Sequence, residues 1–248
     1  MIAIVLCGGY GTRLYPLTLN QPKALLPIAN KPLLNYIIEK INEVGDIKKI
    51  IIVSNNKFFK NFKLWLDKYK DSFEKNIKIL NDGTNNNEVR SGGIGDLWFA
   101  IEKENIRDDV LIVAGDNLFD FSLKPFINFF KQNNNIVNAV YKLGSKKKAK
   151  RFGVVELKSK QIVSFEEKPE NPKTDIISLA LYLYPKFLLN KIKNYLDKNL
   201  NSEGLGYLIK YFSKKEKIFG FVVQGRFFDI GVIEDYKKAN KIWEDLSK

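Results

Sequence analysis

The chain alternates short apolar runs with longer amphipathic segments. In its first part, apolar runs rich in β-branched residues cover residues 2–6, 49–54, 77–80, 110–115 and 136–143. Between them, apolar residues recur at helical spacing over residues 32–44, 58–70, 94–104 and 123–132. The runs are typical of buried strands and the spaced segments of amphipathic helices, so the pattern predicts an α/β sheet with helices on both faces.

The segment 32–44 illustrates the helical pattern. Pro32 suits a first helical position, because the amide hydrogen that proline lacks would have no partner there. Leu33, Ile37, Ile38 and Ile41 then fall on one face. We therefore predict a helix over these residues.

After residue 150 the pattern changes to strands with short connections. Residues 152–157, 161–168 and 176–184 are predicted strands, and residues 186–197 and 204–213 predicted helices. Strands over 218–223 and 226–230 and a helix over 233–246 follow. No repeat, low-complexity linker or break in composition marks a second independent domain, so we predict a single domain over residues 1–248.

Composition narrows the class of protein. The chain has 248 residues, 45% of them hydrophobic, which is enough apolar material for one sizeable core. Cys7 is the one cysteine, so an intramolecular disulfide is impossible and a reducing compartment is expected. The start of the chain lacks the basic leader of a signal peptide, and no apolar run approaches the roughly 20 residues that cross a bilayer. We predict a cytoplasmic protein that does not enter the membrane.

The formal net charge of +13 raises the question of a nucleic-acid partner. The lysines are mostly scattered, and the densest run, residues 146–151, falls in an expected loop without interleaved aromatic residues. We predict a solvated basic surface and no nucleic-acid partner; attraction of anionic ligands is the alternative.

A glycine-rich loop follows the first predicted strand, in the segment LCGGYGTRLYPLT. Gly8, Gly9 and Gly11 let backbone N–H groups approach a polyphosphate without obstruction by side chains. A Walker A loop would need Lys-Ser/Thr after its last glycine, and a dinucleotide-binding loop would open a helix where Pro16 interrupts one. The sequence therefore indicates a phosphate loop of a different kind.

Two basic side chains accompany this loop. Arg13 offers a planar guanidinium to phosphate oxygens, and Lys23 supplies a compact charge from PKALLP, a segment stiffened by its prolines. Together with the glycines they suit a nucleoside triphosphate. The alternative is a glycine turn with two solvated basic residues.

At these residues the sequence resembles the sugar-nucleotide pyrophosphorylases, nucleotidyltransferases that join a sugar 1-phosphate to a nucleoside triphosphate. The resemblance covers nearly the whole chain and is closest to the glucose-1-phosphate thymidylyltransferase and uridylyltransferase branch. It implies a Rossmann-like three-layer fold with a mixed, mostly parallel central sheet. It also implies a nucleotide-binding part near residues 1–120, a sugar-phosphate part near 121–232 and a C-terminal helix at 233–246. The implied nucleotide-binding residues are Leu6, Gly8, Gly9, Gly11, Thr12, Arg13, Asn81 and Gly93, with Arg13 and Lys23 catalytic.

Two aspartates stand where a metal would be needed. Asp116 ends an apolar run, at the carboxyl edge where open α/β sheets bind ligands, and Asp229 follows a short apolar strand and precedes Ile230-Gly231. Each could instead be a turn carboxylate. The resemblance implies that both bind Mg²⁺, because its two metal-binding aspartates match these positions.

A sugar-phosphate pocket is implied by the block FGVVEL with IVSFEEKP. By the resemblance, Gly153 contacts the sugar through its backbone, Glu167 accepts hydrogen bonds from its hydroxyls and Lys168 pairs with its phosphate. A carboxylate suits a diol and an ammonium offsets phosphate charge. A solvated charged cluster at a strand end is the alternative.

Three features depart from the family pattern. Asn81 stands where relatives usually place a glutamine that reads the base, and a longer polar insert occupies residues 84–91. Ala180 takes a glycine position near the sugar, where one methyl group can change the sugar accepted. Arg90 could read a base or a phosphate, or lie exposed.

The sequence thus predicts a magnesium-dependent transferase in which a sugar-phosphate oxygen attacks the α-phosphorus and pyrophosphate leaves. This chemistry needs no protein nucleophile, so the absence of histidine is no obstacle. The best guess is glucose 1-phosphate with dTTP or UTP, in a monomer or small homo-oligomer. Alternatives are a cytidylyl- or guanylyltransferase acting on a heptose or choline-like phosphate, and a noncatalytic subunit that binds sugar nucleotides.

Overall fold

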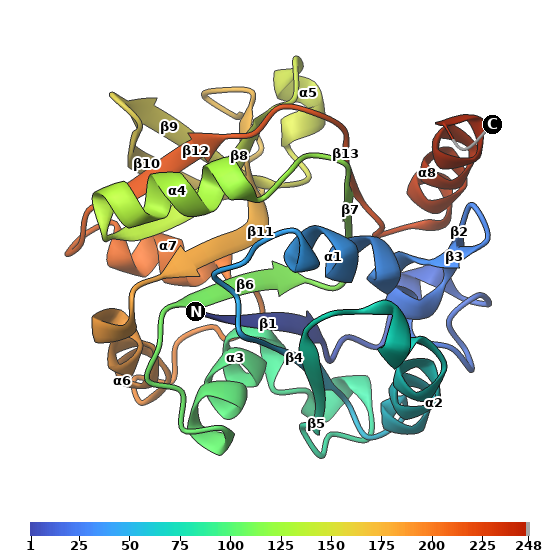
Figure 1. The fold of residues 1–248 in the computed structure, drawn as a ribbon. Helices are drawn as coiled ribbons and strands as arrows, with labels where there is room; N and C mark the ends of the chain where they lie inside the picture. The colour runs from blue at the N-terminus through green and yellow to red at the C-terminus, as the bar shows by residue number, and fades with distance from the viewer. Residues whose placement is uncertain (247–248) are drawn as a thin grey trace. The chain divides into compact units, whose positions relative to one another are not determined.

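The computed structural model describes residues 1–246, whose helices and strands are drawn in Figure 1. These residues divide into two compact units. The first unit contains residues 1–92 and 113–123 and the described residues from Gly225 onward. The second contains residues 93–112 and 124–224. Each unit is built from separate stretches of sequence, and strand β6 (Val110–Ala114) runs from the second into the first.

Parallel strands form the centre of the first unit. They are β1 (Ile2–Cys7), β4 (Lys49–Ser54) and β5 (Asn76–Asn81), with β4 paired to both of the others. In this register Cys7 pairs with Ser54, and Ser54 with Asn81. The carboxyl ends of all three strands therefore share one edge, at which the glycine-rich loop begins.

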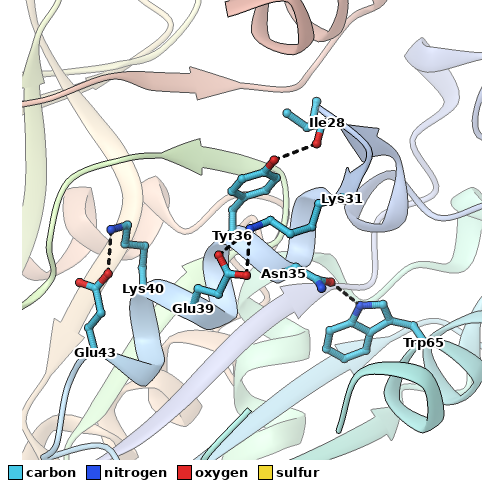
Figure 2. A network of polar contacts seen from close by, with 8 residues as sticks. All are labelled: Ile28, Lys31, Asn35, Tyr36, Glu39, Lys40, Glu43 and Trp65. Carbon is cyan, nitrogen blue, oxygen red and sulfur yellow. Dashed lines mark hydrogen bonds and ion pairs between the residues drawn. The ribbon is translucent and has the colours of Figure 1, made fainter. Parts of the chain in front are cut away.

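Helix α1 (Leu33–Asn42) buries its predicted apolar face and carries a network of polar contacts on its other faces (Figure 2). The hydroxyl of Tyr36 donates to the carbonyl oxygen of Ile28 over 2.9 Å. Nε1 of Trp65, from helix α2 (Phe59–Tyr69), donates to Oδ1 of the buried Asn35 over 2.7 Å. These bonds fix α1 against α2 and the hairpin of β2 (Pro27–Ile28) and β3 (Lys31–Pro32).

The C-terminal helix α8 (Ile233–Leu246) is held against the same hairpin. The hydroxyl of Tyr236 donates to the carbonyl oxygen of Pro27 over 2.7 Å, and Oδ1 of Asn240 accepts from the N–H of Ala29 over 2.8 Å. The ring of Trp243 packs edge-on against those of Tyr36 and Phe228. Helix α8 is thus joined to the first unit by both polar and aromatic contacts.

A short two-stranded sheet completes the first unit. Strands β7 (Asn117–Phe119) and β13 (Phe227–Asp229) are antiparallel, and Asp229 pairs with Asn117. The turn before β13 is fixed by Arg226, whose guanidinium lies 2.8 Å from a carboxylate oxygen of Asp120. This sheet brings together segments more than 100 residues apart.

The second unit is built on a mixed sheet. Its strands are β8 (Ile136–Lys142), β9 (Gly153–Lys158), β10 (Gln161–Glu167), β11 (Ile176–Tyr184) and β12 (Ile218–Val222). β8 pairs with β12 in parallel and with β11 antiparallel, and β10 pairs antiparallel with β9 and β12. Its helices are α3 (Gly92–Lys103, which begins at the boundary), α4 (Lys124–Asn133), α5 (Lys146–Ala149), α6 (Asn190–Leu196) and α7 (Gly206–Phe212).

The predicted α/β fold with a mixed sheet is confirmed, and each predicted strand and helix lies within a few residues of its expected bounds. The strand pairs of the first unit's main sheet are parallel, whereas in the second unit short connections favour antiparallel pairs. The sequence did not indicate β2, β3 and β7, because strands of two or three residues carry no periodicity.

Two local predictions are wrong. Pro32 ends β3 and directly precedes α1 instead of beginning it, with its ψ of 138° outside the helical region. Lys146 belongs to the short helix α5 and not to a loop, because the Ser145 side chain caps this helix by accepting from the N–H of Lys148.

Single helical turns connect several strands. They are η1 (Thr12–Leu14), η2 (Lys23–Leu25), η3 (Lys70–Ser72), η4 (Asn87–Val89) and η5 (Lys186–Leu188). Among the described residues, no helix combines the length and apolar character that a membrane span requires.

Candidate active site

The glycine-rich loop is held in shape by side chains from elsewhere in the first unit. Nδ2 of the buried Asn55 donates to the carbonyl oxygen of Gly8 over 2.9 Å. The hydroxyl of Thr18 donates to the carbonyl oxygen of Gly11 over 2.7 Å, and Gly11 has a φ of +63°, in the left-handed region that favours glycine. Gly9 is exposed, and a Cβ added there would meet no atom within 4 Å. The space beside its backbone is therefore open to a phosphate group.

Thr12 and Arg13 follow this loop in η1 and are both exposed. Leu6 lies before it, and its carbonyl oxygen accepts from the N–H of Gly115 over 2.9 Å. Arg13 thus lies directly after the loop, and the backbone of Leu6 joins β1 to the segment that carries Asp116.

Gly115 allows this segment to approach β1 closely. A Cβ at position 115 would lie 2.3 Å from Sγ of Cys7, 3.0 Å from the carbonyl oxygen of Leu6 and 3.5 Å from Cβ of Ala24. Any larger residue would therefore move the chain away from β1. The next residue is Asp116, so the missing side chain of Gly115 determines where this carboxylate lies.

Lys23 and Asp116 form an ion pair. Nζ of Lys23 lies 2.5 Å from Oδ2 of Asp116, although the two residues are 93 positions apart in sequence. Both side chains are largely buried, with exposed fractions of 16% for Lys23 and 28% for Asp116. The sequence indicated both residues but not their direct contact.

Asp229 joins this pair through the short sheet of β7 and β13. It lies opposite Asn117, and the N–H of Ile230 donates to the carbonyl oxygen of Asp116 over 3.0 Å. A Cβ at Gly231 would lie 3.7 Å from both carboxylate oxygens of Asp229 and from Nη2 of Arg13. The two aspartates, Lys23 and Arg13 therefore form one cluster in the first unit.

The electrostatics of this cluster favour a bound cation. Burial and the negative charge of Asp116 raise the pKa of Asp229 to about 6, against the opposing effect of Lys23 and Arg13. Two carboxylates at close range disfavour each other's charged form even with two basic side chains nearby. A divalent cation would relieve this repulsion.

The donor set fits Mg²⁺. Carboxylate oxygens are ligands that Mg²⁺ prefers, and it commonly takes one or two of them together with water and substrate phosphates. Among the described residues, no group of three or more His, Cys, Asp or Glu side chains could form an all-protein site. Asp116 and Asp229 would hold the ion, and water and phosphate oxygens would complete its coordination.

Asn81 ends β5 and is already engaged in hydrogen bonds. Its Oδ1 accepts from the N–H of Gly83 over 2.9 Å, and its Nδ2 donates to Oδ1 of Asn56 over 2.7 Å. Nδ2 of Asn56 donates in turn to Oδ1 of Asn85 over 2.7 Å. A chain of three asparagines therefore shapes the loop in which base recognition was predicted.

The polar insert at residues 84–91 is tied to the glycine-rich loop. The hydroxyl of Tyr10 donates to Oγ1 of Thr84 over 3.1 Å, and Oδ1 of Asp82 accepts from both the N–H and the hydroxyl of Thr84. Arg90 donates to the carbonyl oxygen of Asn87 and is exposed. The insert is thus organised by its own polar residues and by Tyr10.

Gly93 lies in the second unit, near the start of α3. Its N–H donates to the carbonyl oxygen of Glu203 over 3.0 Å, and a Cβ would lie 3.2 Å from that same oxygen. The N–H of Gly93 is therefore engaged within the protein, and its carbonyl oxygen lies in the first turn of α3, where helix carbonyls accept from the N–H four residues further on.

The predicted sugar-phosphate residues lie together in the second unit. Gly153 begins β9, Glu167 ends β10, and the two are paired across the strands. A Cβ at Gly153 would lie 2.6 Å from Cζ of Phe165 and 3.3 Å from Oε2 of Glu167. Burial raises the pKa of Glu167, and the charge of Lys168 partly opposes this effect.

Lys168 has an unusual backbone. Its φ is +46°, although it is not glycine, and its N–H donates to the carbonyl oxygen of Phe152 over 3.0 Å. The side chain is 62% exposed, with Nζ 4.0 Å from Oε1 of Glu167. This strained conformation directs an ammonium group beside the Glu167 carboxylate, and strain of this kind often marks functional positions.

The hydroxyl group of a buried tyrosine, Tyr182, lies near Glu167. The hydroxyls of Tyr182 and Ser178 are 3.3 Å apart, and Tyr182 is buried. Burial raises the pKa of the Tyr182 phenol well above its usual range, and the charge of Glu167 adds to this effect. Tyr182 therefore stays neutral and can donate a hydrogen bond.

Four residues of the site were missed in the sequence: Asn55, Thr18, Gly115 and Gly206. Asn55 and Thr18 act on distant glycines, which no local pattern reveals. Gly115 directly precedes Asp116, so an apolar strand ending in Gly-Asp was a usable signal. Gly206 faces Glu167 and Phe165 from α7. It comes 39 positions after Glu167 in the chain, and no local pattern in the sequence indicates this contact.

Comparison with known proteins establishes the family. The model of the family described as "Nucleotidyl transferase" matches residues 2–245, which is nearly the whole chain. The chain belongs to the nucleotidyl transferase family. The family predicted from the glycine-rich loop and the two aspartates is confirmed.

Two relatives show how far this nucleotidyl transferase resembles named proteins. It is 33% identical over 244 residues to the "Bifunctional protein GlmU" of Methanocaldococcus jannaschii, covering 97% of this chain and 54% of the relative. It is 30% identical over 243 residues to a Sulfolobus acidocaldarius protein provisionally named a mannose-1-phosphate guanyltransferase, covering 96% of this chain and 62% of the relative. The chain thus spans between about half and two thirds of the length of these relatives.

A solved structure shows the same fold. A Bacillus anthracis protein, provisionally named a glucose-1-phosphate thymidylyltransferase and crystallised with sucrose, matches with a TM-score of 0.85 and 23% identity. The match covers 99% of this chain and 96% of the other. The predicted α/β nucleotidyltransferase fold is therefore confirmed.

Proposed function

We propose that this nucleotidyl transferase joins a sugar 1-phosphate to a nucleoside triphosphate, giving a sugar nucleotide and pyrophosphate. The observation that carries the proposal is the cluster of Asp116, Asp229, Lys23 and Arg13 beside the glycine-rich loop. It combines an open backbone cradle for phosphates, two cationic side chains and two carboxylates suited to a divalent ion.

The reaction requires binding and charge neutralisation and no protein nucleophile. A phosphate oxygen of the sugar 1-phosphate forms a bond to the α-phosphorus, while the bond from that phosphorus to the oxygen bridging to the β-phosphate breaks. Pyrophosphate leaves with the bonding electrons, and the metal, when bound, offsets negative charge on the phosphates. Arg13 and Lys23 hold phosphate oxygens, and Asp116 and Asp229 hold the ion.

Sugar 1-phosphate binding is assigned to the second unit. The carboxylate of Glu167 would accept hydrogen bonds from sugar hydroxyls, and the ammonium of Lys168 would pair with the phosphate. The partly buried position of Glu167 supports this role, because hydrogen bonds gain strength where water is scarce.

The substrate pair is the finer part of the proposal. Glucose 1-phosphate with dTTP or UTP follows from the sequence resemblance. Mannose 1-phosphate with GTP is a second candidate, favoured by the name of the Sulfolobus acidocaldarius relative. Asn81, already bonded to Asn56 and Gly83, supports a base contact that differs from that of a free glutamine.

Mass spectrometry of products tests the proposal directly. The protein is incubated with Mg²⁺, the common nucleoside triphosphates and a panel of sugar 1-phosphates. A new sugar nucleotide would identify both substrates together. The matched control is Asp116→Asn, which keeps the size of the side chain but loses one metal-binding carboxylate and should lower turnover at least about 100-fold.

Two results would contradict the proposal. If no product formed from any pair while an intact sugar nucleotide still bound, a noncatalytic sugar-nucleotide-binding role or a different phosphate acceptor would take its place. Near-normal turnover by Asp116→Asn would remove this carboxylate from the mechanism.

A further inference from the structure

Gly206 lies against the predicted sugar-binding carboxylate. It is the first residue of α7, is buried, and faces the end of β10. A Cβ at this position would lie 2.5 Å from Cζ of Phe165 and 2.7 Å from Oε2 of Glu167. Both distances are too short for any real side chain to occupy without displacing one of these groups.

Gly153 restricts the same two groups from β9. A Cβ there would lie 2.6 Å from Cζ of Phe165 and 3.3 Å from Oε2 of Glu167. The ring tip of Phe165 and the carboxylate of Glu167 are thus flanked by the α-carbons of two glycines. The space between the two glycines forms a slot that holds the Phe165 ring tip and the Glu167 carboxylate. Because the glycines are 53 positions apart in sequence, this slot exists only in the folded unit.

The backbone of Gly206 does not itself require glycine, because its φ lies outside the left-handed range. Gly204, two residues earlier, has ordinary space, since the nearest atom to an added Cβ is Cδ2 of Tyr207 at 3.7 Å. The two glycines differ in what surrounds them. Of positions 204 and 206, only 206 needs the absence of a side chain to leave room for the Glu167 carboxylate and the Phe165 ring.

The slot limits the conformations of a flexible side chain. Glutamate has three side-chain torsions, and fixing them upon ligand binding would cost entropy. A carboxylate that is already held meets sugar hydroxyls without this cost, and small displacements of such groups weaken binding strongly. The geometry of the slot therefore matters for affinity as well as for packing.

We infer that Gly206 is a positioning residue, which holds the Glu167 carboxylate in the orientation that binds the sugar 1-phosphate. The inference rests on the proposed function, since it takes Glu167 as a sugar-binding residue. It adds α7 to the elements that determine the sugar site.

The test compares Gly206→Ala with Gly204→Ala as the matched control. Gly206→Ala should raise the KM for the sugar 1-phosphate about 10-fold, because one hydrogen bond to a charged group is misaligned. It should leave the KM for the nucleoside triphosphate within about 2-fold, since hydrogen bonds to that substrate are unaffected. Gly204→Ala should leave both values unchanged. An unchanged sugar-phosphate KM in Gly206→Ala, or an equal rise in both KM values, would overturn the inference.

A second variant separates positioning from packing. In Phe165→Leu/Gly206→Ala the ring atoms that meet the new methyl group are removed, while the contact with Oε2 of Glu167 remains. The double variant should regain the melting temperature of Phe165→Leu alone and keep the raised sugar-phosphate KM. Return of that KM to the Phe165→Leu value would show that packing of the ring, and not the carboxylate, explains the effect.

A substrate-free measurement distinguishes this inference from the proposed function. Carbon-13 NMR of the glutamate δ-carbons, with Glu167→Gln for assignment, follows the titration of Glu167. Displacement into solvent in Gly206→Ala should lower its pKa toward the ordinary value, and an unchanged titration would contradict the slot. A wild-type protein that forms no sugar nucleotide, with the titration shifted as expected, would overturn the sugar-binding role while the slot itself stands.

Discussion

Nζ of Lys23 lies 2.5 Å from Oδ2 of Asp116, one of the two carboxylates proposed to bind the metal. A cation that binds the Asp116 carboxylate would find the Lys23 ammonium group already in contact with that carboxylate. The same ammonium is proposed to bind triphosphate oxygens. If Asp116 binds the metal as proposed, Lys23 would exchange its partner when metal and nucleotide arrive together, and free metal would compete with it.

Replacing Lys23 by methionine should strengthen metal binding in the absence of nucleotide. Without the competing ammonium, Mn²⁺ should bind about 10-fold more tightly, since one close charge pair is worth at least that factor. Turnover should fall, because the phosphates lose a positive partner. Titration calorimetry with Mn²⁺ measures the first effect. Lys40→Met is the control, because Lys40, on α1, pairs with Glu43 at the end of that helix and not with Asp116 or Asp229. Equal Mn²⁺ affinity in wild type and Lys23→Met would contradict the competition.

Asp229→Asn should stabilise the metal-free protein at neutral pH. The folded state raises the pKa of Asp229 to about 6. In the folded protein, Asp229 therefore carries an unfavourable negative charge at pH values above about 6. At pH values below the ordinary pKa of aspartate, it is neutral in both the folded and the unfolded state. Relative to wild type, the free energy of unfolding should rise by about 1–3 kcal/mol at pH 7.5, and the difference should fall below about 1 kcal/mol at pH 4.

Urea unfolding in EDTA at the two pH values measures this difference. Mg²⁺ should then stabilise the wild type but not Asp229→Asn, because metal binding needs both carboxylates. The exposed Asp67 gives a control substitution, Asp67→Asn, for which no pH-dependent gain is expected. A gain of equal size at pH 4 and pH 7.5 would mean that charge is not its cause.

Lys168→Gly should stabilise the fold while weakening sugar-phosphate binding. At a φ of +46° a lysine is strained and glycine is not, so Lys168→Gly should be about 1 kcal/mol more stable than Lys168→Ala. Both variants should raise the KM for the sugar 1-phosphate more than that for the nucleotide. Thermal unfolding and steady-state kinetics measure the two effects.

Lys160 provides the control, because it lies in the turn between β9 and β10 with a φ of +69°. Lys160→Gly should stabilise without changing either KM. If Lys168→Ala raised the nucleotide KM more than the sugar-phosphate KM, the assignment of the two substrates to their binding residues would be wrong.

Gly115→Ala should destabilise the protein and lower activity. Its new methyl group would lie 2.3 Å from Sγ of Cys7, and overpacking of this kind costs about 1–3 kcal/mol. Asp116 would move with the backbone, so turnover should fall too. Cys7→Ala/Gly115→Ala should recover part of the stability but not all, since the carbonyl oxygen of Leu6 stays 3.0 Å from the same position. Full additivity of the two single changes in denaturant unfolding would argue against this contact.

The sequence predicted the elements with strong periodicity and the residues that lie in local motifs. The apolar face of α1 and the glycine-rich loop both depend on residues close together in the chain. Asp116 and Asp229 were singled out through their settings at strand ends, but their closeness depends on the pairing of β13 with β7, and β7 was too short to predict.

The remaining features depend on contacts across long stretches of chain. The bond from Asn55 to Gly8 and the slot at Gly206 require two segments to meet in three dimensions. From the sequence alone, a glycine required because a Cβ would clash with its neighbours cannot be distinguished from a glycine required by the backbone conformation of a turn. Asn81 shows a related limit, because its position predicted a base contact but gave no sign of the hydrogen bonds by which it also shapes the loop.

The contacts of α8 with the rest of the first unit affect which of its elements unfold locally. Three residues separate Asp229 from the start of α8. Tyr236 holds the helix to β2, and Asn240 holds it to the turn that follows β2. Local release of this helix would free β13 from β7 without disturbing the parallel strands. Amide exchange should then show α8 and β13 opening together at a lower free energy than β1 and β4. Asp229 would then lie in a segment that opens before β1 and β4, and a bound ion would slow amide exchange there first.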